Sequence, residues 1–113
     1  MSKVTVYYKP KCQTCRKTIK FLEGLGHDLD LRDLDEYPPP RSLLETHIHA
    51  KNVKAYLNTR SAPYRDHNLK DDPPTKKGAI ELMMRDPSLI KRPVVVKGKR
   101  AVFGYDEPEL KDL

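Results

Sequence analysis

The sequence predicts one α/β domain that spans residues 1–113, and three observations lead to this prediction. Strand-like alternation and helical periodicity follow one another near the N-terminus. The middle of the chain, about residues 41–90, has helical patterns, and a hairpin pattern followed by a short helix comes last. We therefore expect a mixed sheet built from a β-α-β half and a β-β-α half, with a helical insertion between the halves. A chain of 113 residues with 37% hydrophobic residues has room for one modest core.

The first half opens with a predicted strand over residues 3–8, in which apolar and polar positions alternate and β-branched and aromatic residues dominate. Pro10 ends it. Apolar residues at helical spacing predict a helix over residues 14–25, and a glycine pair marks its end. A second alternating run, residues 27–34, follows closely enough for a right-handed parallel crossover.

The insertion follows three consecutive prolines. Residues 42–45 read as a capping box that opens a helix running toward Lys51, and residues 53–57 continue in helical character. The pair Pro73-Pro74 opens a further helix whose apolar residues lie at 79–84.

The second half is a predicted hairpin and a helix. Residues 93–96 and 100–103 form the two arms, joined by a turn at 97–99. The acidic segment 106–109 is expected to cap a short terminal helix.

The charge of the chain is strongly basic, with a formal net charge of +6. This charge attracts anions, but the 22 Lys and Arg are scattered from Lys3 to Lys111 among only six Tyr and two Phe. No basic-aromatic platform stands out, so we do not expect direct nucleic-acid binding. The sequence has neither the apolar core of a signal peptide nor a run of about 18 apolar residues. We expect a cytoplasmic monomer that does not enter a membrane.

Two cysteines, Cys12 and Cys15, lie where the first predicted helix begins. A thiol reacts as its thiolate, and the amides at a helix N-terminus favour a thiolate on Cys12. Cys15 is about one helical turn further on, close enough for a disulfide but less accessible. Cys12 is therefore the predicted nucleophile, and Cys15 its resolving partner. The basic sequence neighbours expected to assist Cys12 are Lys9, Lys11, Arg16 and Lys17.

Two other interpretations of the cysteine pair remain open. A zinc site would need two more ligands, and His47 and His49 are the tempting pair. In a predicted helix, however, residues two apart point to different faces, so we expect no metal. The second alternative is a chance pair of inert cysteines, but a strand-turn-helix is the setting that redox Cys-x-x-Cys motifs occupy.

Three motifs, in this order along the chain, resemble those of a known family. They are residues 8–17 around the cysteines, residues 58–61 (Asn-Thr-Arg-Ser), and residues 89–96 followed by Gly104-Tyr105. Together they resemble the arsenate reductase-like proteins of thioredoxin-like fold. That family includes glutathione-linked arsenate reductases, small thiol reductases and Spx-type transcriptional regulators.

The resemblance implies roles for individual residues. Cys12 would attack the substrate, while Arg60 and Arg92 would hold an anionic group and stabilise the thiolate, as guanidinium groups do. Thioredoxin-like folds place a cis-proline opposite the reactive cysteine, so the bond from Arg92 to Pro93 is predicted to be cis. No bound cofactor is implied. Glutathione would be a co-substrate, and glutathione, glutaredoxin or thioredoxin would be the redox partner.

Two features depart from the arsenate reductases that the chain resembles. The segment 104–107 carries carboxylates where those enzymes have a further arginine, and Cys15 is typical of the Spx-type regulators instead. Two functions follow. The first is a thiol–disulfide oxidoreductase. The second is a redox-sensing regulator that binds the C-terminal domain of the RNA polymerase α subunit. A structural or interaction role with idle thiols is the third, blander interpretation.

Overall fold

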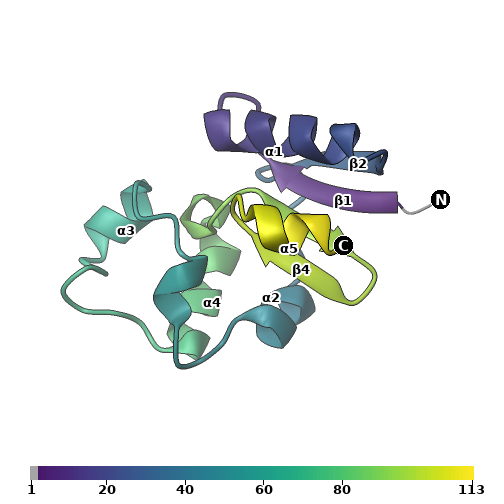
Figure 1. The fold of residues 1–113 in the computed structure, drawn as a ribbon. Helices are drawn as coiled ribbons and strands as arrows, with labels where there is room; N and C mark the ends of the chain where they lie inside the picture. The colour runs from purple at the N-terminus through teal and green to yellow at the C-terminus, as the bar shows by residue number, and fades with distance from the viewer. Residues whose placement is uncertain (1–2) are drawn as a thin grey trace. The chain divides into compact units, whose positions relative to one another are not determined.

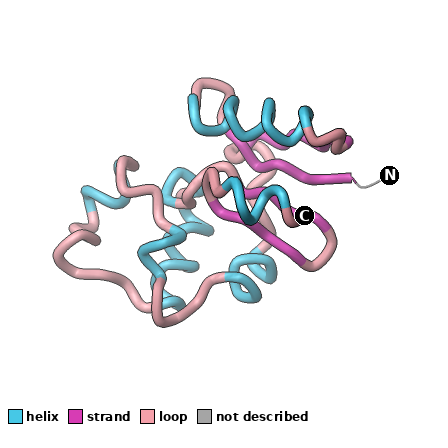
Figure 2. Tube along the Cα trace, in the orientation of Figure 1, coloured by secondary structure: helices cyan, strands magenta, loops and turns pink. Residues whose placement is uncertain are grey.

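The computed structural model describes residues 3–113, which form two compact units. The first unit contains the chain up to Tyr37 together with Arg92–Leu113. The second is Pro38–Lys91, and the segment expected as a helical insertion, about 41–90, lies within it. Figure 2 shows strands in the first unit and helices joined by loops in the second.

A four-stranded sheet in the order β2-β1-β3-β4 forms the centre of the first unit (Figure 1). β1 (Lys3–Tyr8) pairs in parallel with β2 (Asp28–Asp33) and antiparallel with β3 (Val94–Lys97), which pairs antiparallel with β4 (Arg100–Phe103). This is the predicted mixed sheet of a thioredoxin-like fold, assembled from both ends of the chain.

Two helices complete this unit, α1 (Gln13–Gly24) and α5 (Glu107–Lys111). Because side chains alternate along a strand, Val4 and Val6 share one face of β1. Leu22 of α1 and Leu110 of α5 belong to the same buried cluster as these valines. Both helices therefore pack on one face of the sheet. The remaining members of the cluster are Val95 and Val102.

The hairpin and the terminal helix agree with the prediction. Gly98 has a φ of 59°, as the first position of a two-residue hairpin turn of type II′ requires. Asp106 caps α5, since its carboxylate accepts a hydrogen bond from the amide of Glu109 at 3.3 Å.

The second unit contains five short helical segments. Thr75 caps the longest of them by accepting a hydrogen bond from the amide of Gly78 at 3.1 Å. Further hydrogen bonds join the middle of the unit to its C-terminal end: the amide of Asn58 donates to the carbonyl of Leu89 at 2.7 Å, and the amide of Lys91 donates to the carbonyl of Tyr56 at 2.9 Å. The segments are α2 (Arg41–His47), η1 (Val53–Tyr56), α3 (Ala62–Asp66), α4 (Lys76–Arg85) and η2 (Pro87–Leu89).

The start and end of α2 differ from the prediction. Pro40 is its N-cap, so Ser42 lies inside the helix and no capping box forms. The helix ends at His47 and does not run toward Lys51, because Ile48 turns to an extended conformation with its side chain buried. Burial of this one side chain overrides the helical pattern.

None of the helices in residues 3–113 has the length and hydropathy that a bilayer span requires.

Candidate functional site

Cys12 is the N-cap of α1, directly after the turn that leaves β1. Its amide donates to the carbonyl of Lys9 at 3.1 Å, which closes the turn. Its Sγ accepts a hydrogen bond from the amide of Cys15 at 3.4 Å. The sulfur therefore occupies the position in which a cap oxygen normally receives an orphan helical amide. A negative charge on this atom also gains from the helix dipole.

The two thiols differ in their environments. Burial raises the pKa of Cys12, but hydrogen bonds from the thiol and amide of Cys15, together with the positive charge of Arg92, outweigh it, so the net pKa of Cys12 is lowered. Cys15 is fully buried, and this burial, with the neighbouring sulfur of Cys12, raises its pKa to about 12. Of the two thiols, Cys12 is thus the one that more readily forms a thiolate, and Cys15 keeps its proton at neutral pH. Both cysteines are free thiols in the structure.

Arg92 reaches the cysteine site from the segment that leads into β3. The Arg92–Pro93 peptide bond is cis, which confirms the prediction made from the family resemblance. Pro93 is buried, and its carbonyl accepts a hydrogen bond from the amide of Gly104 at 2.8 Å. Arg92 is half-buried, and its guanidinium acts on the Cys12 sulfur by charge and by hydrogen bonding.

A pocket of about 390 Å³ opens beside the Cys12 thiol. Its size lies within the range of small-ligand sites. The residues that line it are Lys9, Pro10, Lys11, Cys12, Asp33 and Arg92.

Two of the lysines that flank Cys12 in sequence, Lys9 and Lys17, have other partners in the structure, while Lys11 lines the pocket. Lys9 forms ion pairs with Asp33 and Asp35. The ammonium of Lys17 lies 4.5 Å from the centre of the Tyr105 ring, in a cation–π contact. The cation that lowers the pKa of Cys12 is Arg92, from the far end of the chain. The sequence analysis expected basic neighbours of Cys12 to assist the thiol, whereas the cation named here, Arg92, is 80 positions away in the sequence.

The sequence analysis did not identify Asp33 and Asp35, the two carboxylates at the edge of the sheet where β1 and β2 end. Asp33 stands opposite Tyr8 in the parallel register of β1 and β2, so it ends its strand beside the turn that carries Cys12. The carboxyl ends of parallel strands meet at one edge. The alternating pattern of residues 27–34 was the available signal, but it does not give the register.

Arg60 lies in the second unit, in a tight turn before α3. The side chain of Asn58 accepts a hydrogen bond from the amide of Arg60 at 3.1 Å, and the hydroxyl of Ser61 donates to the carbonyl of Asn58 at 2.7 Å. These hydrogen bonds shape the Asn-Thr-Arg-Ser motif into a turn, in which Arg60 is exposed. Its assignment to an anion site stays a prediction.

The segment 104–107 has a structural role in the first unit. Gly104 has a φ of 86°, Asp106 caps α5, and the Tyr105 ring packs edge-on against Phe21 at 5.8 Å between centroids. Its carboxylates do not line the pocket beside Cys12.

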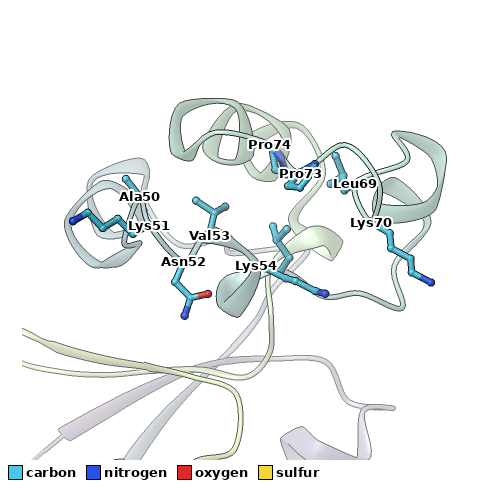
Figure 3. A pocket seen from close by; sticks show the side chains of 10 residues that line it. Ala50, Lys51, Asn52, Val53, Lys54, Leu69, Lys70, Pro73 and Pro74 are labelled. Atoms are coloured by element: carbon cyan, nitrogen blue, oxygen red, sulfur yellow. The ribbon is translucent and has the colours of Figure 1, made fainter.

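The second unit has a pocket of its own, about 250 Å³ in volume (Figure 3). Val53 and Leu69 supply apolar surface, while Lys51, Lys54 and Lys70 extend away from it at the rim. None of the site residues predicted from the sequence lines this pocket. Among residues 3–113 there is also no cluster of three or more histidine, cysteine or acidic side chains arranged to hold a metal ion.

The fold and the cysteine site together define a thioredoxin-like α/β protein with a Cys-x-x-Cys pair at the start of its first helix. The sequence model of the ArsC family matches residues 7–113. The chain belongs to the ArsC family.

Relatives of two functional types are similar to the chain. The global transcriptional regulator Spx of Listeria innocua is 30% identical over 112 residues, covering 96% of this chain and 84% of Spx. The arsenate reductase of Escherichia coli is 34% identical over 98 residues, covering 85% of this chain and 70% of the enzyme. A crystal structure described as a possible arsenate reductase from Streptococcus mutans superposes with a TM-score of 0.79 at 34% identity, covering 93% of this chain and 92% of that one.

Proposed function

We propose that the chain is a cytoplasmic thiol–disulfide oxidoreductase, similar to the arsenate reductases, in which Cys12 is the nucleophile and Cys15 or glutathione resolves the intermediate. The observation that carries the proposal is the amide of Cys15 at 3.4 Å from the Cys12 sulfur. In addition, the two thiol pKa values shift in opposite directions: that of Cys12 is lowered and that of Cys15 is raised. A nucleophile and a resolving thiol require this difference.

The proposed reaction transfers two electrons. The Cys12 thiolate attacks one sulfur of a substrate disulfide, forming a mixed disulfide and releasing the other half as a thiolate. Cys15 then loses its proton to the departing thiolate and attacks the Cys12 sulfur. This step forms the Cys12–Cys15 disulfide and releases the second half of the substrate. Two molecules of glutathione, or a glutaredoxin or thioredoxin dithiol, reduce the protein again and become a disulfide.

Arg92 and Arg60 have supporting roles in this proposal. Arg92 stabilises the Cys12 thiolate and binds an anionic part of the substrate, such as a glutathione carboxylate, and the family resemblance gives Arg60 an anion-binding role as well. Pro93, which follows Arg92 across the cis bond, is proposed to contribute to substrate binding. The reaction is proposed to need no metal and no bound cofactor, because the two thiols and the co-substrate carry all the electrons.

A coupled assay tests the enzyme function. The purified protein is given glutathione, glutathione reductase and NADPH, with bis(2-hydroxyethyl) disulfide or arsenate as substrate. We expect NADPH oxidation that Cys12→Ser abolishes. Cys15→Ser should slow the disulfide reaction and make it depend more steeply on glutathione. Absence of turnover by the native chain with both substrates contradicts the proposal.

The second candidate function is a redox-sensing regulator that binds the C-terminal domain of the RNA polymerase α subunit. It is supported by the Cys-x-x-Cys pair and by the similarity to Spx along 96% of the chain. Titration of fluorescently labelled α domain with reduced and oxidised protein tests it. Binding that depends on the disulfide, without turnover, favours the regulator. Turnover without binding excludes it.

A further inference from the structure

Lys9 joins the carboxyl ends of two neighbouring strands. Its ammonium lies 3.2 Å from Oδ1 of Asp33 and also binds Oδ2 of Asp35. The Asp33 carboxylate is fixed from a second side, since its Oδ1 accepts the amide of Asp35 at 2.9 Å. The side chains of Lys9 and Asp33 are only 25% and 26% exposed. We call this arrangement the Lys9 clamp; Lys9 and Asp33 are partly shielded from water, whereas Asp35 is 59% exposed.

The Lys9 clamp lies at the pocket of Cys12, because Lys9 and Asp33 both line it. Three cations of the first unit therefore lie in this region, Lys9, Lys11 and Arg92. Lys9 is engaged by two carboxylates, and Arg92 acts on the Cys12 sulfur. Lys11 is left as the exposed cation. Once the thiolate has formed, the anions Asp33, Asp35 and Cys12 balance the three cations.

We propose that the Lys9 clamp determines which substrates the pocket accepts: the two carboxylates offset the positive charge of Lys9, so the pocket takes organic disulfides of low charge in preference to multiply charged anions. The inference rests on the proposed reductase function and names its substrate class. A disulfide without charge near its sulfurs approaches the Cys12 thiolate without an electrostatic cost. A dianion finds no surplus of positive charge in these residues to offset repulsion by the thiolate.

The titration behaviour of the clamp agrees with a tight pairing. The hydrogen bond to Asp35 has the largest effect and raises the pKa of Lys9; burial opposes it, and the hydrogen bond to Asp33 adds to the rise. The amide of Asp35 and the ammonium of Lys9 lower the pKa of Asp33, although burial opposes them. Lys9 and Asp33 therefore stay charged across the neutral range, and their pairing persists there.

Alkylation of Cys12 with two reagents of different charge tests the clamp. In both reactions the thiolate displaces iodide from carbon and forms a C–S bond, but iodoacetate is an anion and iodoacetamide is neutral. The ratio of the two rate constants reports the electrostatics of the pocket and cancels changes in the amount of thiolate. Mass spectrometry of the Cys12 peptide separates this reaction from any at Cys15.

Removing the carboxylates that pair with Lys9 should speed the reaction of Cys12 with iodoacetate relative to iodoacetamide. We expect the double variant Asp33→Asn/Asp35→Asn to raise the iodoacetate-to-iodoacetamide ratio about threefold or more, and Lys9→Met to lower it. The clamp carries a net charge of −1, the double variant leaves +1 and the triple variant leaves none, so the triple variant should lie between the native ratio and that of the double variant. The matched control is Glu23→Gln/Asp28→Asn, which removes two exposed carboxylates of the first unit that do not line the pocket, and it should leave the ratio unchanged. Circular dichroism verifies that each variant is folded.

Two outcomes of the alkylation experiment would overturn the clamp proposal. If Lys9 already serves incoming anions, the Asp33→Asn/Asp35→Asn variant keeps the native ratio and the triple variant behaves like Lys9→Met. The ratio is measured without turnover, so an inactive native chain would count against the reductase function alone. With turnover, the native chain should prefer bis(2-hydroxyethyl) disulfide to the dicarboxylate dithiodiglycolate, and freeing Lys9 should narrow that preference.

Discussion

The amide of Cys15 donates to the sulfur of Cys12 at 3.4 Å, so the resolving cysteine supports the nucleophile through its backbone before it acts through its own thiol. The same helical turn that supplies this amide buries the Cys15 side chain. One local geometry therefore lowers the pKa of one thiol and raises that of the other.

The first prediction concerns the pH dependence of alkylation. Cys12 should react with iodoacetamide with a midpoint below the ordinary thiol pKa, because its thiolate is stabilised in the folded chain. Cys15 should stay unreactive until the pH approaches about 12. Peptide mass spectrometry across a pH series measures both. Equal rates for the two cysteines below pH 7 would be inconsistent with this site.

The second prediction concerns Arg92. Arg92→Met removes a positive charge and a hydrogen bond from the Cys12 sulfur, so the midpoint of Cys12 alkylation should move to higher pH. Arg92→Lys should restore part of the effect, since it keeps the charge but loses the planar donor group. Arg16→Met is the matched control, because Arg16 is an exposed arginine in the same region of the chain. A comparable change in that control would mean that only general charge matters.

The third prediction is a loss of stability at alkaline pH that depends on Cys15. The folded chain holds the Cys15 proton up to about pH 12, whereas an unfolded thiol loses it near about 8.5. Between these values the native state binds the extra proton, so the free energy of unfolding falls as pH rises, by up to about 1.4 kcal/mol per pH unit. Below the unfolded value the contribution is fully present. Cys12, with its lowered pKa, has the opposite sign, and its contribution is lost as pH falls through the folded value.

Cys15→Ala isolates this effect. Urea unfolding of the native chain and the variant, both reduced, should show a stability difference that shrinks from pH 8 to pH 10. A constant difference over this interval would exclude the raised pKa.

The fourth prediction compares two interactions that hold α5 in place, the burial of Leu110 and the ion pairs of Arg100. Leu110 is fully buried in the cluster with Val4 and Val6, and Leu110→Ala should lower the free energy of unfolding by about 2–5 kcal/mol. Arg100 pairs with Glu109 at 2.9 Å and Asp112 at 3.0 Å, but these side chains are 43% to 79% exposed. Arg100→Met should therefore cost about 1 kcal/mol or less. Urea unfolding of both variants measures the two losses of unfolding free energy. A larger loss for Arg100→Met than for Leu110→Ala would contradict this prediction.

The sequence was most informative where periodicity is strong and local. The expected helix over 14–25 and strand over 3–8 match α1 and β1 within a residue, and the hairpin and the Asp106 cap were also as predicted. In each of these segments the pattern of apolar residues, the turn residues and the cap all favour the same structure.

It was least informative in the second unit. The five-residue helix α3 is too short to show a period, and the end of α2 depends on the burial of Ile48, a tertiary effect. The Cys12 site shows the same limit. Its nucleophile follows from local spacing, but the pairing of Lys9 with Asp33 depends on strand register, which alternation alone does not give.

The sheet order β2-β1-β3-β4 sets when the thiol becomes reactive during synthesis. A nascent chain that has reached only Lys91 already contains Cys12 and Cys15, but β1 still lacks its neighbour β3 and the sulfur lacks Arg92. On the ribosome this cysteine is therefore a more ordinary thiol. The charge of Arg92 reaches the site only with the segment Arg92–Leu113, so the Cys12 thiolate gains this cation after both cysteines have been made.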